Sequence, residues 1–306
     1  MKVTALAGGG GAAKFLRGLV LAIAPEDVTV IGNTGDDTVV HGLSVSPDLD
    51  IVTYTLAGLV DDGGWGFKSD TTHALDQLAG YGVDTWFTLK DKDLGTHMAR
   101  TTWLADGVPL SEVTDRIRLG LEVRTRIIPM SNDDVRTRIV TKEGIEREFQ
   151  EYFVRFTHSE EVASVSFQGA ASASPAPGVL EAIADADRII ICPSNPVVSI
   201  GPILAVPGIR EALIARRADV FGISPIVQGA ALKGPADKLL PVVGAEASAS
   251  GVAGLYADFC GTFVVDYRDA PEAGKVEDLG MRAMVLETVM ETEGLARQLA
   301  KEILAL

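Results

Sequence analysis

The chain has 306 residues, of which 47% are hydrophobic, so it is long and apolar enough for one large domain or two smaller ones with a proper core. Its formal net charge of -15 argues against non-specific binding to nucleic acid or to anionic membranes, because both need a basic surface. We therefore expect no nucleic-acid partner and no membrane, and a small or metal-neutralised ligand fits better.

The first elements are expected to be a strand, a glycine stretch and a helix. An apolar strand is expected over residues 3–7, followed by a loop made of Gly8, Gly9, Gly10 and Gly11 and then by a helix that Pro25 closes. This order opens a doubly wound parallel sheet, in which the loop and the helix N-terminus can hold a phosphate. Taken alone, the loop is equally compatible with a tight turn that only packs helix on strand.

An acid-rich stretch follows the second strand, which we expect over residues 28–31. The strand breaks at residues 32–35, where two glycines permit a positive φ. Four carboxylates then lie within a short span: Asp36, Asp37, Asp48 and Asp50. Such density predicts a bound cation, and Mg²⁺ is usually held by one or two carboxylates together with substrate phosphates. Singly, each aspartate is also explained as a cap for a neighbouring amide or, for Asp48, as part of a helix start.

The next segments carry aromatic residues and then arginines. Trp65 lies in a glycine-rich loop and can stack on a planar ring, although covering the edge of the core is the commoner role of a lone tryptophan. A helix ending near Gly80 and a strand over residues 85–89 should follow. Beyond them, alternating segments 135–141 and 148–156 predict a hairpin. Arg136 and Arg138 belong to the arginines of this region, which either face an anionic substrate or form a solvated surface.

The α/β alternation resumes near residue 178. Strands are expected over residues 188–192, 220–223 and 262–266, each with helices around it. Ser194 and Asn195 directly follow the first of these strands, in a proline-rich loop at the sheet edge where ligands bind in α/β folds. A rigid proline turn is the alternative for this loop.

These elements predict an α/β fold. Its core is a Rossmann-like, doubly wound and mostly parallel sheet formed by residues 1–90 and 178–306, with a smaller α+β cap subdomain inserted at residues 91–177. Cys192 and Cys260 form neither a metal-ligand spacing nor a disulfide framework, and the N-terminus shows no export signal, so we expect a cytoplasmic protein. The four histidines have no metal-site spacing, and His41 alone lies among the acids.

Several motifs, taken together, resemble the CofD family of 2-phospho-L-lactate transferases, called FbiA in actinobacteria, which act in the biosynthesis of the deazaflavin coenzyme F-420. They cover nearly the whole chain and are GGGGAAKFLRGL from Gly8, NTGDD from Asn33, SPDLD from Ser46, YTLAG from Tyr54, GWG from Gly64 and PSNPVVSIGPIL from Pro193.

The resemblance implies a transferase that moves a phospholactyl-type or phosphoenolpyruvyl group from a guanosine diphosphate-linked donor to the ribityl hydroxyl of the deazaflavin Fo. GMP would be released and Mg²⁺ required. By similarity, the glycines, Asn33, Ser194 and Asn195 contact the donor nucleotide, the aspartates hold Mg²⁺, and Trp65 lies near the deazaflavin. Asp36 or Asp48 is the expected catalytic base. We also expect a homodimer, which the apolar last helix permits.

Two other functions are compatible with the same sheet. A nicotinamide-dependent oxidoreductase is disfavoured because the second strand ends in Gly32-Asn33 instead of an acid. A non-enzymatic nucleotide-sensing regulator would use the glycine loop without needing two acidic pairs. The sequence leaves open which three-carbon group is transferred, which residue reads guanine, and which aspartate is base and which is ligand.

Overall fold

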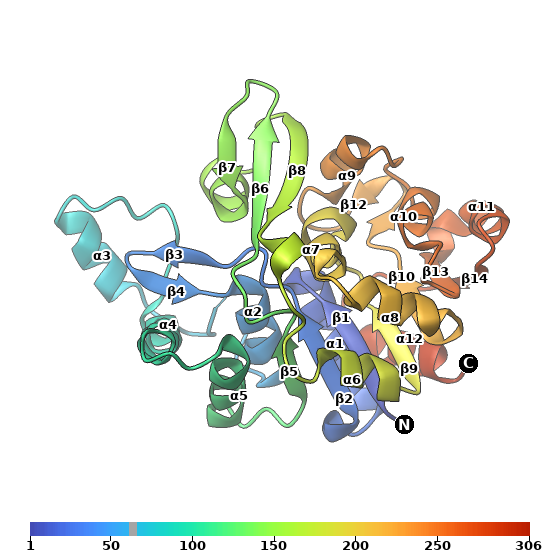
Figure 1. Cartoon of the computed structure of the whole chain (residues 1–306), viewed down its shortest axis with the longest axis horizontal. Coiled ribbons are helices and arrows are strands. Elements are labelled where there is room, and N and C mark those ends of the chain that lie inside the picture. Colours follow the sequence, from blue (N-terminus) through green and yellow to red (C-terminus); the bar gives the residue numbers. More distant parts are fainter. Residues whose placement is uncertain (61–65) are drawn as a thin grey trace.

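The computed structural model describes residues 1–60 and 66–306, and its centre within that part is a seven-stranded sheet (Figure 1). The strands of this sheet are β1 (Val3–Ala7), β2 (Val28–Gly32), β5 (Arg126–Pro129), β9 (Arg188–Ile191), β10 (Val220–Ile223), β13 (Thr262–Asp266) and β14 (Arg282–Leu286). They lie in the order β14-β13-β10-β9-β1-β2-β5, and every neighbouring pair is parallel. The predicted Rossmann-like α/β class is confirmed.

Helices cover both faces of this sheet (Figure 1). The helices of the described residues, of which α3 and α4 lie away from the central sheet (Figure 1), are α1 (Gly9–Ala22), α2 (Pro47–Leu56), α3 (His73–Gly80), α4 (Asp91–Ala105), α5 (Leu110–Gly120), α6 (Val179–Asp185), α7 (Gly201–Ala205), α8 (Ile209–Ala215), α9 (Ala236–Leu239), α10 (Ala249–Tyr256), α11 (Ala273–Asp278) and α12 (Glu293–Leu304). Short helical turns lie at Pro25–Asp27, Glu151–Arg155, Ala170–Ser172, Pro196–Ile200, Arg217–Asp219, Pro241–Val243 and Tyr267–Glu272.

The central strands are apolar throughout because both of their faces are buried. In β1, for example, all five residues are buried: Val3, Ala5 and Ala7 belong to the core that α1 and α12 cover, whereas Leu6 belongs to the core under α6, α8 and α10. Helices α1 and α12 approach closely, since a Cβ on Gly18 would lie 2.3 Å from the backbone of Ala296. The glycine is therefore a packing requirement.

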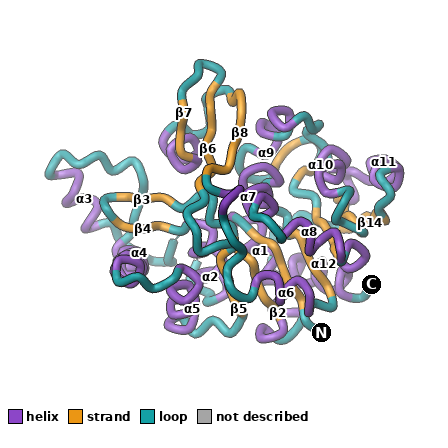
Figure 2. Tube along the Cα trace, in the orientation of Figure 1, coloured by secondary structure: helices purple, strands orange, loops and turns teal. Residues whose placement is uncertain are grey.

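Three small antiparallel sheets stand beside the central sheet. Their strands are β3 (Thr38–Val40) with β4 (Leu43–Val45), β6 (Arg136–Thr141) between β7 (Glu146–Glu148) and β8 (Val162–Gln168), and β11 (Ile226–Val227) with β12 (Ala230–Ala231). His41 and Gly42 form the two-residue loop of the first hairpin, with φ of 51° and 80°, which matches the twist of the strands. Figure 2 shows that loops connect the sheet β7-β6-β8 to the rest of the chain.

Some predicted elements are wrong. Residues 85–89 form no strand, and the expected hairpin partner 148–156 is a strand only up to Glu148, after which Glu151–Arg155 is helical. Strands β5, β8 and β14 were not predicted. β5 pairs with β2 in the central sheet, although it lies inside residues 91–177, the range expected to form the cap.

Within the described ranges, no single helix has the length and apolar character needed to cross a membrane. One pair, Pro196–Ala205 with Ile209–Ala215, passes such a test only when its two parts are taken together, and they are bent by 92°.

Candidate active site

The candidate site lies at the carboxyl edge of the central sheet, where β1 is flanked by β2 on one side and by β9 on the other. The order of the strands reverses at β1: β2 and β5 follow on one side of it, and β9 and β10 follow on the other. Open α/β sheets bind ligands at such a switch point. Residues 8–11 after β1, 33–37 after β2 and 193–195 after β9 meet there, and we call the space that they border the switch crevice.

The glycine stretch is not a loop, contrary to expectation, because α1 begins at Gly9. Gly8 is the N-cap with an extended backbone (φ −155°), and Gly9 has a φ of +74°. Gly11 lacks room for a side chain, since a Cβ there would lie 2.4 Å from the carbonyl oxygen of Pro193, whereas a Cβ on Gly10 would meet nothing within 4 Å. The helix start is thus packed against the loop after β9 and open at Gly10. The free N–H groups of a helix start favour anions.

Asp48 connects the glycine stretch to Asn33. Its Oδ1 accepts a hydrogen bond from the backbone N–H of Gly9 at 2.8 Å, and its Oδ2 accepts one from Nδ2 of Asn33 at 2.9 Å. Asn33 is fully buried, donates also to the carbonyl of Val198 at 3.2 Å, and accepts from the N–H of Gly35 at 2.8 Å. Three predicted site residues from three segments therefore form one hydrogen-bonded group.

Ser194 and Asn195 border the same crevice. The Ser194 hydroxyl accepts a hydrogen bond of 3.3 Å from the N–H of Gly8. Asn195 caps the turn Pro196–Ile200, because its Oδ1 accepts from the N–H groups of Val197 and Val198 at 2.9 and 3.3 Å. The amide Nδ2 of Asn195 is buried and has no hydrogen-bond partner in residues 1–60 and 66–306. That nitrogen is a free donor beside the crevice.

We expected the two glycines of the break after β2 to adopt a positive φ, and this expectation is wrong. They are needed because the backbone there is closely packed. Neither Gly32 nor Gly35 has a positive φ. A Cβ on Gly32 would lie 2.4 Å from the side chain of Leu49, and one on Gly35 would lie 2.7 Å from Oγ1 of Thr137. The backbone bond from the Thr137 N–H to the carbonyl of Gly35, at 2.7 Å, joins β6 to this break.

The aspartates at the break are buried and incompletely paired. Among the described residues, Oδ1 of Asp36 and Oδ1 of Asp37 have no hydrogen-bond partner, while Oδ2 of Asp37 accepts from the Ser46 hydroxyl at 2.7 Å. Burial, followed by the charge of Asp48, raises the pKa of Asp36 well above its ordinary value. Burial also raises the pKa of Asp37 to about 7 and that of Asp48 to about 6. A cation at this point would relieve the cost of ionising these groups.

Asp50 has a different environment from the other aspartates. It forms a buried ion pair with Arg100 of α4, with a bond of 3.0 Å from NH1 of Arg100 to its Oδ2, and NH1 also contacts His97. In residues 1–60 and 66–306, no group of three or more His, Cys, Asp or Glu side chains is placed to hold a metal. The four aspartates therefore do not assemble into one cage. The unpaired oxygens of Asp36 and Asp37 fit Mg²⁺, which needs only one or two carboxylates when phosphates complete its shell.

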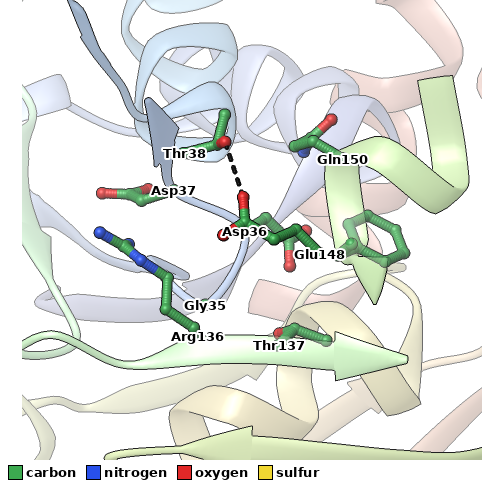
Figure 3. A pocket seen from close by; sticks show the side chains of 9 residues that line it. Gly35, Asp36, Asp37, Thr38, Arg136, Thr137, Glu148 and Gln150 are labelled. Carbon is green, nitrogen blue, oxygen red and sulfur yellow. Dashed lines mark hydrogen bonds between the residues drawn. The ribbon is translucent and has the colours of Figure 1, made fainter. Parts of the chain in front are cut away.

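Two hollows open beside Asp36 and Asp37. The smaller is bordered by residues 35–38, 136–137 and 148–150, and Figure 3 shows its side chains. There the Thr38 hydroxyl donates to Glu148 at 3.1 Å, which joins β3 to β7. The larger hollow, of about 180 Å³, lies between β3 and β4, the ends of α4 and α5, and residues 132–134 and 136.

The sequence missed two residues of this site. Thr137 and Glu148 carry no local motif, and only the packing of β6 and β7 against residues 35–38 brings them to the aspartates. Ser46 begins the SPDLD motif, but the motif did not indicate its hydrogen bond to Asp37. His41 is exposed in its hairpin loop. Trp65 lies outside the described residues, so its predicted place near a flat ring stays a prediction.

Comparison with known proteins places the chain in a family. The model of the 2-phospho-L-lactate transferase CofD family matches residues 3–295. Phosphoenolpyruvate transferases from Kitasatospora aureofaciens and Streptomyces coelicolor are each 46% identical to the chain, covering all of it and 98% of their own lengths. One from Mycolicibacterium smegmatis is 41% identical, covering 87% of this chain and 86% of its own.

A solved structure of a UPF0052 family member from Bacillus halodurans shares the fold, with a TM-score of 0.66 at 20% identity over 99% of this chain and 98% of that one. The family match spans the β1 glycines, the Asn33 break and the loop after β9, which form the switch crevice. The chain therefore belongs to the CofD family and is a transferase of the type that acts in coenzyme F-420 biosynthesis.

Proposed function

We propose that the chain transfers a phospholactyl-type or phosphoenolpyruvyl group from a guanosine diphosphate-linked donor to the ribityl hydroxyl of Fo, releasing GMP, with Mg²⁺ required. The observation that carries this proposal is the pairing of an open helix start at Gly10 with buried, unpaired carboxylate oxygens on Asp36 and Asp37. The helix start suits the diphosphate of the donor, and the carboxylate oxygens suit the Mg²⁺ that accompanies it.

The chain's own groups supply binding and orientation. The first turn of α1, with Ser194 and Asn195, borders the space for the donor's phosphates. Asp48 is held at the helix start by Gly9 and Asn33, where its carboxylate would repel the diphosphate unless a cation accompanies the donor. A bound Mg²⁺, held by Asp36 and Asp37, would neutralise charge on the diphosphate.

The acceptor Fo is placed in the larger hollow. Its lining combines apolar side chains, among them Val45, Leu104 and Leu110, with polar ones, which suits a flat heterocycle with a hydroxylated chain. Asp37 and Thr38 border both hollows, so a hydroxyl placed at their junction is next to Asp36.

In the proposed reaction the hydroxyl oxygen attacks the donor phosphorus that carries the three-carbon group. The bond from that phosphorus to the bridging oxygen breaks, and GMP leaves with the electron pair. The proton of the hydroxyl passes to the carboxylate of Asp36 or of Asp48.

The test is product formation by Asp36→Asn and Asp48→Asn variants, measured by mass spectrometry with Fo and Mg²⁺. We expect kcat to fall by about 10²-fold or more in each, because general base and charge effects have that size. Asp258→Asn is the matched control, since Asp258 pairs with Arg210 on the surface. Near-normal Mg²⁺-dependent transfer in both site variants would contradict the assignment.

A further inference from the structure

Arg136 lies at the junction of the two hollows. It is the first residue of β6, it borders both spaces, and its side chain is 28% exposed. In Figure 3 its guanidinium extends into the space beside Asp37. The position places a cation where donor and acceptor would meet.

The surroundings of Arg136 are otherwise acidic. The other charged side chains that border the hollows, among the described residues, are all carboxylates: Asp36, Asp37, Asp133, Asp134 and Glu148. An anionic ligand entering here is repelled unless a positive group receives it. Arg136 is the basic side chain that can do so in this part of the chain.

The present partner of Arg136 is easily exchanged. NH2 of Arg136 lies 2.8 Å from Oδ1 of Asp134, whose side chain is 74% exposed. An ion pair as exposed as this contributes at most about 1 kcal/mol, so a ligand carboxylate can replace it. By contrast, Arg138 on the same strand is bound to Glu148 at 3.1 Å and to Gln168 at 2.9 Å.

The transferred group has a chemical feature that matches this site. Phospholactate and phosphoenolpyruvate, the acids in the names of the family and of its relatives, both carry a carboxylate on the carbon that bears the phosphate. Arginine binds a carboxylate through two parallel hydrogen bonds, and this geometry distinguishes it from a bare positive charge.

We propose that Arg136 binds the carboxylate of the donor's three-carbon acid and so determines the class of group that is transferred. This inference rests on the proposed function. It assigns to the strand β6 a direct part in donor selection, while the switch crevice holds the nucleotide.

The experiment compares the donor with GDP, which lacks the three-carbon acid. In Arg136→Met we expect the KM for the donor to rise at least tenfold, while the inhibition constant of GDP stays within twofold of wild type. Arg136→Lys should recover part of the donor affinity, because it restores the charge without the paired hydrogen bonds. Arg116→Met is the control, because Arg116 pairs with Glu112 on the surface of α5 and borders neither hollow, and it should leave both constants within twofold.

An unchanged donor KM in Arg136→Met overturns the inference, and so does a GDP inhibition constant that rises in step with the donor KM, because Arg136 would then contact the diphosphate. Circular dichroism and thermal unfolding establish that the variants are folded. If Arg136→Met does not fold, the same comparison of donor and GDP is made with Arg136→Lys. Failure of the proposed function is recognised separately, because the wild-type protein would then form no product from Fo.

Discussion

Substitution of two neighbouring glycines by alanine tests the switch crevice in depth. In Gly11→Ala the new Cβ would lie 2.4 Å from the carbonyl oxygen of Pro193, about 1 Å inside an ordinary carbon to oxygen contact. Both partners are backbone, so α1 and the loop after β9 must move apart, at a cost of roughly 1–3 kcal/mol in the free energy of unfolding.

Gly10→Ala is the matched partner, because its Cβ would meet nothing within 4 Å and Gly10 has no positive φ. Alanine is the better helix former by about 0.5–1 kcal/mol, so this variant should be slightly more stable than wild type. Gly11 lies in the same helix and gains the same propensity, so the two variants should differ by the packing cost alone, roughly 1–3 kcal/mol in urea unfolding.

Binding of GDP, measured by calorimetry, gives the second half of the test. The methyl group of Gly10→Ala would stand where we place the phosphates, so affinity should fall about tenfold or more although stability does not. Equal stability of Gly11→Ala and wild type would refute the close contact with Pro193. Unchanged GDP affinity in Gly10→Ala would refute the phosphate position.

Three further substitutions or conditions test the buried polar groups. Asn33→Ala leaves the partners Asp48 and Gly35 unsatisfied and should cost roughly 2–5 kcal/mol in urea unfolding; a loss below about 1 kcal/mol would contradict the network. Arg100→Met should cost about 3–5 kcal/mol, because the buried carboxylate of Asp50 then loses its arginine partner, and the added change Asp50→Leu should recover part of this loss. Raising the pH from 4 to 7 should lower the free energy of unfolding, because the pKa values of Asp37 and Asp48 are raised to about 7 and about 6 in the folded protein. The stabilisation from these groups is complete below their ordinary pKa of 3.8 and is lost as they ionise. In Asp37→Asn the slope of unfolding free energy against pH should flatten near pH 7, and an unchanged slope would contradict the raised pKa.

The central strands were predictable because they are buried on both faces. β1, β10 and β13 coincide with the expected ranges, since an uninterrupted short apolar run bounded by turn residues is typical of a buried strand. β5 and β14 lie at the edges of the sheet; β14 is partly exposed along its length, and β5 has only three buried residues after an exposed arginine. Edge strands therefore give a weaker signal.

The site was predictable where its residues follow strands directly. Gly8, Asn33 and Ser194 each stand at the end of a parallel strand, and parallel strands bring their carboxyl ends together. Thr137 and Glu148 come from a separate sheet that packs on the break after β2, and no local pattern records that contact. We expected Asp50 to be a Mg²⁺ ligand, because its actual partner, Arg100, is 50 residues away and no local pattern indicates the ion pair.

Transfer to Fo is the most direct measurement of the central claim. The protein is incubated with Fo, Mg²⁺ and either the lactyl or the phosphoenolpyruvyl guanosine diphosphate donor, and the products are identified by mass. We predict Fo enlarged by the three-carbon phosphate group, one GMP for each product molecule, and no product when Mg²⁺ is removed by chelation. Absence of product with both donors, or transfer that is undiminished after chelation, would contradict the proposed reaction.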